Sequence, residues 1–172
     1  MRTVEVALAG VFSALALAIP FAFRGTLQFV VPNTGYTATL ASHVPVMLST
    51  VVGPLASVIV GSASTLGFFV TLGPVVAARA ATHILWGVAT AFTVKKGMSF
   101  PRALFLVALP LHAIPEGLVV IPFGIPYEAA VLNIVGTAVH HTVDSLISIA
   151  VLRAARPLLD RFKYQSPAKA IS

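Results

Sequence analysis

Long apolar runs follow one another along almost the whole chain and leave few residues for connecting loops. Of the 172 residues, 58% are hydrophobic and 9% are charged, and the mean hydropathy is +0.96. A helix needs about 20 predominantly apolar residues to cross a hydrocarbon core ~30 Å thick. The sequence therefore predicts an all-α integral membrane protein, a bundle of membrane-spanning helices that forms a single domain over residues 1–172.

Glycine–proline pairs help to divide the apolar residues into six predicted spans. Gly53-Pro54 and Gly73-Pro74 bracket the third span, and proline at a helix start costs no hydrogen bond. Residues 24–37 contain turn-forming residues and are predicted to be a long ordered loop. The second span is short, so we expect it to be tilted or to pack incompletely across the bilayer. The six spans are expected at residues 4–23, 38–52, 55–72, 75–94, 101–121 and 127–152.

Basic residues are concentrated on one side of this six-span bundle. Nine lysines and arginines fall on that side, Arg24 falls on the other, and Arg79 lies within a span. Short cytoplasmic loops collect Lys and Arg, so both termini are predicted to be cytoplasmic, including a tail over residues 153–172. The net charge of +6 thus reflects topology, and the tail is too sparse to form a nucleic-acid interface. The nine residues are Arg2, Lys95, Lys96, Arg102, Arg153, Arg156, Arg161, Lys163 and Lys169.

All five histidines lie inside or at the edge of an apolar run. Ionisable side chains are costly there, and by default they mark a functional site. With a rise of 1.5 Å per residue, polar groups from four predicted helices fall at similar depths in the outer half of the bilayer. We therefore expect a polar ligand to bind between these helices. The layer comprises His43, Arg79, His83, His112, Glu116, Asn133 and Thr137.

Arg79 and His83 are four residues apart and share one helix face, with Trp86 about one turn further along. Arginine offers a charged planar fork that suits a carboxylate, which favours an anionic ligand. The alternative is an internal ion pair between Arg79 and Glu116. His112 and Glu116 are also four apart, a spacing that allows a hydrogen bond to orient the imidazole. Trp86 either packs in the core or stacks against a flat ligand.

Three further polar residues, His140, His141 and Asp144, lie deeper in the last span. Imidazole and carboxylate groups suit divalent metals, but Asp144 can equally accept a hydrogen bond from His140. The spacing lacks the His-Glu-x-x-His arrangement of zinc hydrolases, and the absence of cysteine excludes thiolate ligands and disulfides. We expect no metal site, and the role of these three residues stays open.

Small residues recur every four positions along the first predicted helix, at Gly10, Ala14 and Ala18. Such stripes let helix backbones approach closely within a membrane. The stripe predicts contact with another membrane protein, and packing inside the bundle is the alternative.

Six short spans, a long first outer loop and the Ala14-x-x-x-Ala18 motif resemble the substrate-binding S component of an energy-coupling factor (ECF) vitamin transporter. The similarity covers residues 7–150. It is greatest to the pantothenate and niacin members, in residues 37–45, 61–69 and 77–83. The chain lacks the histidine directly after Met1 of the nickel and cobalt members, and it lacks a phosphate-binding loop.

This resemblance implies a function in a multi-pass protein of a prokaryotic-type cell membrane. Ala14 and Ala18 would face a membrane-embedded coupling protein, and the loop around residues 33–36 would cover the site. Two partner ATPases would hydrolyse ATP, and the chain itself would need no cofactor.

The expected ligand is pantothenate, and niacin is the alternative, because both carry a carboxylate for Arg79. Tyr36, Thr71, His83 and Asn133 suit the hydroxyls and amide of pantothenate. A rival class is an intramembrane hydrolase using His112, Glu116, His140 and Asp144, but no serine nucleophile with a paired base accompanies these residues.

Overall fold

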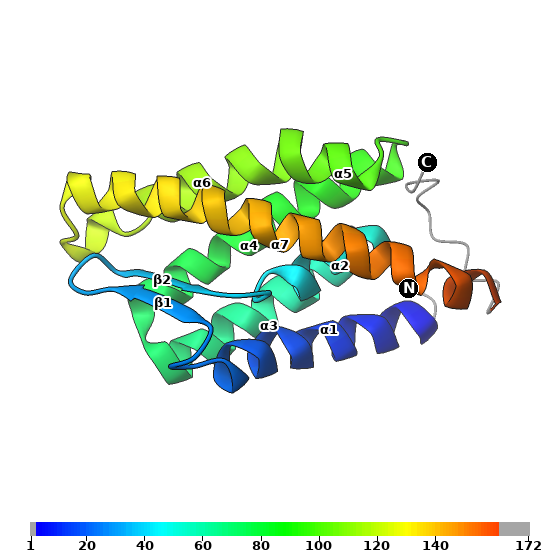
Figure 1. Ribbon diagram of the computed structural model, residues 1–172, viewed down its shortest axis with the longest axis horizontal. Coiled ribbons are helices and arrows are strands. Elements are labelled where there is room, and N and C mark those ends of the chain that lie inside the picture. The colour runs from blue at the N-terminus through cyan, green and yellow to red at the C-terminus, as the bar shows by residue number, and fades with distance from the viewer. Residues whose placement is uncertain (1–2, 162–172) are drawn as a thin grey trace.

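The computed structural model describes residues 3–161, which form a bundle of helices with a two-stranded hairpin at one end (Figure 1). Among these residues, five helical segments are long and apolar enough to cross a membrane. Large apolar side chains such as Leu66, Val70 and Leu106 are exposed on their outer surfaces, as lipid contact requires. The chain is therefore a multi-pass helical membrane protein. The segments are α1 (Thr3–Ala22), α3 (Pro54–Leu72), α4 (Pro74–Lys95), Phe100–Phe123 and α7 (Tyr127–Arg161, apolar to Pro157).

The second predicted span differs from the prediction, so the six-span bundle is not confirmed. Residues 38–52 contain the end of a strand, a turn and α2 (Val44–Val52), which has nine residues. Such a helix is about 14 Å long, half the thickness of a hydrocarbon core. Nearly every residue of α2 is buried, against α1, α3, α4 and α7. A helix that is apolar all round is stable as an interior helix, which is what α2 is.

The predicted loop over residues 24–37 contains a β-hairpin. Strand β1 (Gln28–Val31) pairs antiparallel with β2 (Tyr36–Thr39), with Gln28 opposite Thr39 and Val31 opposite Tyr36. The connecting turn uses the left-handed conformation at Asn33 and Gly35, residue types that adopt it at low cost.

The hairpin and α2 together lead the chain back along the bundle. The hairpin tip lies near the start of α7, whereas the start of α1 lies at the opposite end, with the end of α7 (Figure 1). Both ends of the described chain are thus at the same end of the bundle. The prediction that this end faces the cytoplasm still rests on the basic residues.

The fifth predicted span is one apolar segment with three kinds of helix. It comprises α5 (Phe100–Ala103), the π-helix η1 (Leu104–Ala108), α6 (Leu109–Leu118) and the 3-10 helix η2 (Ile121–Phe123). Pro110 lacks the N–H that a continuous α-helix would use, and the wider π turn lies directly before it. The π turn also shifts the face that α6 presents to the interior.

Close packing of α3 on α4 generates the first prediction. A Cβ atom at Gly61 would lie 2.8 Å from Ile84 Cγ1 and 3.2 Å from the Ile84 nitrogen, so Gly61→Val should push the helices apart. We expect a loss of ~1–3 kcal/mol of stability, measured by thermal unfolding in detergent. Gly10→Val is the matched control, because a Cβ there meets no atom of the described residues within 4 Å. Equal unfolding temperatures for the two variants would contradict this packing.

Candidate functional site

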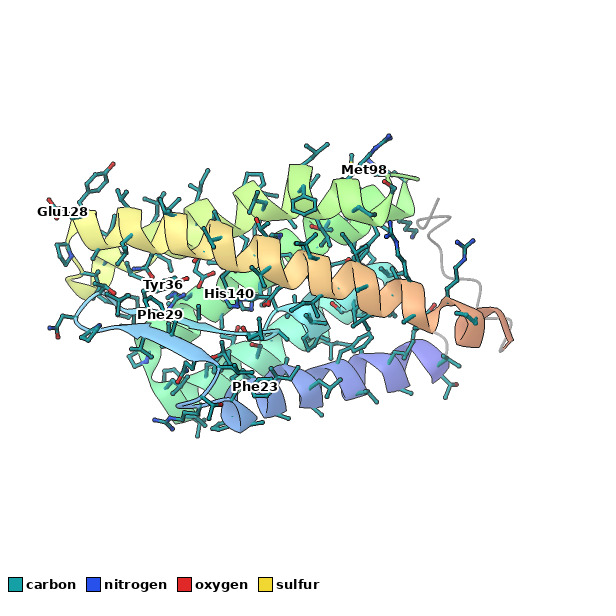
Figure 2. The ribbon with its side chains drawn as sticks, in the orientation of Figure 1. Phe23, Phe29, Tyr36, Met98, Glu128 and His140 are labelled. Carbon is teal, nitrogen blue, oxygen red and sulfur yellow. The ribbon has the colours of Figure 1, made fainter. Side chains whose placement is uncertain are left out.

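The five histidines gather with two carboxylates in the interior of the bundle. The ring centroid of His43 lies 4.9 Å from that of His83 and 4.5 Å from those of His112 and His140. His141 lies 5.1 Å from His112. We call this group, with Arg79, Glu116 and Asp144, the polar cluster. It lies between the hairpin, α4, α6 and α7, and in Figure 2 His140 points from α7 into this region.

Asp144 anchors the turn that joins β2 to α2. Its Oδ1 accepts the Ala41 N–H at 2.8 Å, and its Oδ2 accepts the His43 N–H at 3.0 Å. Ala41 has a φ of 64°, a left-handed conformation that costs a non-glycine residue of order 1–2 kcal/mol. Charge-assisted hydrogen bonds to the carboxylate offset that cost. Asp144, whose role the sequence leaves open, is thus a structural anchor for His43. His43 precedes α2 and does not lie inside a membrane span, where the sequence predicted it.

His140 secures the last residue of the hairpin. Its Nε2 lies 2.9 Å from the Thr39 carbonyl oxygen and 3.1 Å from Asp144 Oδ2. Both neighbours are acceptors, so Nε2 carries a hydrogen. His140 and Asp144, which are four residues apart on α7, therefore bind the same end of the hairpin together.

Arg79 is a second attachment point for the hairpin, nearer its tip. The guanidinium donates from Nη1 to the Gly35 carbonyl at 2.7 Å and from Nη2 to the Thr37 carbonyl at 3.1 Å. Nη2 also lies 2.5 Å from Glu116 Oε1, so the ion pair considered as an alternative is formed. A carboxylate that binds both Nη atoms of Arg79 must therefore displace carbonyl or carboxylate oxygens of the protein, whereas Arg79 Nε has no hydrogen-bond partner among the described residues.

Tyr36 covers Arg79 from the hairpin. The guanidinium carbon lies 5.5 Å from the ring centroid, a cation–π distance. The ring packs on α7 at Gly136, where a Cβ would lie 2.7 Å from the Tyr36 hydroxyl. Burial raises the pKa of the Tyr36 phenol above its usual value, and the nearby Arg79 charge opposes this rise. The hydroxyl is therefore neutral at physiological pH.

A chain of contacts orients His112. The His141 Nε2 lies 3.1 Å from the Leu104 carbonyl, which can only accept, so this nitrogen carries a hydrogen. With His141 neutral, its Nδ1 accepts from His112 Nδ1 at 2.8 Å. The remaining nitrogen of His112, Nε2, then faces Glu116 Oε2 at 2.5 Å. Leu104 begins the π-helix, so the irregular turn helps to set this orientation.

Of the other three predicted ligand-binding residues, Trp86 lies at the cluster, Asn133 contacts the hairpin, and Thr71 lies at neither. Trp86 is fully buried under the cluster, with its ring centroid 5.1 Å from that of His112 and 5.8 Å from that of His83. Asn133 donates to the Thr34 carbonyl at 2.9 Å and so contacts the hairpin turn. Thr71 is exposed, and its hydroxyl donates to the Gly67 carbonyl of its own helix. The structure therefore does not bring Thr71 to the site.

A small polar cavity lies beside the cluster, under the hairpin. Its volume is about 40 Å³, which is room for a few water molecules. In this conformation the cavity is too small for pantothenate or nicotinate. Its polar lining comprises Gln28, Thr37, Thr39, Ser42, His43, Arg79, His83, Glu116 and His140.

The small-residue stripe of α1 lies on the outer surface of the bundle. Gly10, Ala14 and Ala18 are exposed, whereas Ala9 and Ala16 on the other face are buried. The stripe therefore does not pack inside the bundle, which was the alternative interpretation. Other residues of α1 make those internal contacts.

Asp144 generates the second prediction. Asp144→Asn removes the negative charge and turns an NH2 group toward an N–H donor of His43 or His140, so the turn before α2 loses its anchor. Hydrogen bonds to charged groups contribute ~1.5–3 kcal/mol, and we expect a loss of that order in thermal unfolding. Glu128→Gln is the matched control, because Glu128 is an exposed acid at the start of the same helix. If both variants unfold at the wild-type temperature, Asp144 is not an anchor.

No protein-family model, curated protein or solved structure matches this chain. The interpretation of the site therefore rests on its geometry and on the resemblance of the sequence segments described above.

Proposed function

We propose that this chain is the S component of an ECF-type importer, a binding subunit without catalysis of its own that captures pantothenate at the cell surface. The observation that carries the proposal is Arg79, a buried arginine whose fork holds the covering hairpin by two carbonyl oxygens. A buried guanidinium selects planar anionic groups, and carbonyl oxygens are weaker partners for it than a carboxylate. A ligand carboxylate can therefore replace them.

The proposed exchange gives the hairpin a way to open. Gly35 and Thr37 leave Arg79 when the carboxylate arrives, while Asp144 continues to hold Ala41 and His43 at the base of the hairpin. The tip then moves outward about this base and enlarges the 40 Å³ cavity. In the proposal, His43, His83 and Tyr36 contact the hydroxyls and amide of pantothenate. His112 and Glu116 support Arg79 from α6.

Nicotinate is the second candidate, and the shape of the site favours it. The cavity is small, the rings of His43 and His83 line it edge-on to each other, and Trp86 packs edge-on against His83 behind them. A flat pyridine ring with one carboxylate needs less opening of the hairpin than pantothenate does, and it can pack on these rings.

The proposed partners are a membrane-embedded coupling protein and two ATPases, which hydrolyse the ATP. The exposed stripe of Gly10, Ala14 and Ala18 supports this part of the proposal, because it offers a smooth helix face on the opposite side of α1 from the bundle.

The third prediction concerns ligand binding by the purified chain. Calorimetric titration should show one pantothenate per chain without ATP, and nicotinate is titrated in parallel. Arg79→Lys keeps the charge beside Glu116 but loses the fork. We expect affinity to fall about tenfold to over a hundredfold, as the loss of ~1.5–3 kcal/mol implies.

The matched control is Arg24→Lys, because Arg24 is exposed on the same side of the bundle. Saturable heat with nicotinate and none with pantothenate transfers the assignment to nicotinate. Wild-type affinity in Arg79→Lys would show that the arginine only holds the hairpin and Glu116.

The fourth prediction separates ligand capture from assembly. Ala14→Leu or Ala18→Leu adds bulk to the stripe, so co-purification with the coupling protein and ATP-driven uptake should both fall. Ligand affinity of the isolated chain should stay at the wild-type value. Ala81→Leu is the control, because Ala81 is an exposed alanine on α4. Weakened ligand binding with an intact complex would contradict the interface.

A further inference from the structure

Four members of the polar cluster converge as metal ligands do. His43 comes from the turn before α2, His83 from α4, and His112 and Glu116 from α6. One nitrogen or carboxylate oxygen from each lies within 4.8 Å of those of the other three, and all four residues are buried. A tetrahedral zinc ion with bonds of 2.0–2.2 Å holds its ligand atoms roughly 3.4 Å apart. The most distant of the four groups therefore need to approach one another by about 1.4 Å to reach that spacing.

Each of these four side chains also has a buried polar atom without a hydrogen-bond partner. The atoms are His43 Nδ1, His83 Nδ1, His112 Nε2 and Glu116 Oε2, and the partners sought are those among the described residues. Two close contacts involve these atoms without hydrogen-bond geometry: His43 Nδ1 lies 3.2 Å from Asp144 Oδ2, and His112 Nε2 lies 2.5 Å from Glu116 Oε2. An unpaired buried polar atom costs about 1–3 kcal/mol, so four in one place need an explanation. Such atoms are satisfied by a ligand that accepts several lone pairs at once.

The contact between His112 and Glu116 points to a cation. When His112 donates from Nδ1 to His141, its Nε2 offers a lone pair to Glu116 Oε2 at 2.5 Å. Two lone pairs at this distance repel unless a proton or a metal ion lies between or beside them. The two atoms are not aligned as a hydrogen bond. A shared ion beside them relieves the repulsion and also reaches His43 and His83.

We propose that His43, His83, His112 and Glu116 bind one divalent transition-metal ion of the zinc and cobalt class. Three imidazoles and one carboxylate are a ligand set typical of such ions. Supporting contacts orient two ligands, as in known metal sites: Arg79 holds Glu116 through Oε1 and leaves Oε2 free, and His141 holds His112. The carboxylates of Glu116 and Asp144 offset the added charge.

The proposal replaces the expectation of no metal site. The four ligands come from three separate elements, so no single sequence motif predicts them. The deeper group that the sequence suggested, His140 and Asp144 with His43, is less suited to a metal. Both Asp144 oxygens already accept backbone N–H groups, and His140 Nε2 already carries a hydrogen for Thr39.

The test uses the full chain, purified in detergent without chelators, with Zn²⁺ and Co²⁺ as probes. Elemental analysis should find about one zinc per chain after incubation and desalting. Co²⁺ should give the visible absorption of a tetrahedral site. Glu116→Gln and His83→Gln should each weaken Co²⁺ binding at least about tenfold. Thr90→Val is the control, because Thr90 is buried on α4 beyond the cluster and bonds to its own helix.

Thermal unfolding of each variant shows that it is folded, and only folded variants are compared. Absence of bound zinc together with absence of tetrahedral Co²⁺ bands in the wild type would overturn the proposal and assign the His112–Glu116 contact to a shared proton. Binding that persists in both cluster variants would overturn it as well, by placing the ion elsewhere. Pantothenate and nicotinate are titrated in a separate experiment, with and without Zn²⁺. A chain that binds zinc but no vitamin would contradict only the proposed function, and a chain that binds a vitamin but no zinc would contradict only the metal site.

Discussion

The ion pair between Arg79 and Glu116 is the interaction on which the interior of this protein depends. Each charge is nearly inaccessible, and each is surrounded by groups from several elements. Removing one partner of a buried pair typically costs about 3–5 kcal/mol, because the other charge is left without compensation. Arg79 also holds Gly35 and Thr37, and Glu116 also contacts His112. One pair therefore links α4, α6 and the hairpin.

The hairpin is attached at two places by two kinds of contact. Near its tip it is held by carbonyl oxygens on the Arg79 guanidinium, contacts that an anionic ligand can exchange. At its base it is held by backbone N–H groups on Asp144 and by the Thr39 carbonyl on His140. A solute carboxylate can compete with the Thr39 carbonyl for His140, but it has no means to replace the N–H groups that donate to Asp144. In the proposed function this difference makes the tip movable and the base fixed.

Apolar length and loop breaks predict the first, third and fourth spans closely, and the fifth in extent. The sixth begins at Tyr127 as predicted, but its helix continues to Arg161, into residues expected to form the tail. The prediction of the second span is wrong because residues 38–43 form the end of a strand and a left-handed turn. Asp144, which anchors this turn, lies about a hundred residues later in the sequence. Depth along helices brought Arg79, His83, His112 and Glu116 together, since burial of charge in a membrane demands partners. Thr71, expected at the site because its hydroxyl suits pantothenate, is exposed, since the chemistry of a side chain says nothing about which side of a helix faces lipid.

The most direct test of a hairpin that exchanges its Arg79 contacts for a ligand is hydrogen–deuterium exchange of the detergent-purified chain, with and without saturating pantothenate or nicotinate. We expect amides at the hairpin tip, within residues 31–37, to exchange faster in the presence of ligand, because Gly35 and Thr37 no longer bind the guanidinium. The amides of Ala41 and His43, held by Asp144, should be unchanged. Unaltered exchange throughout the hairpin in a ligand-saturated sample would contradict this mechanism.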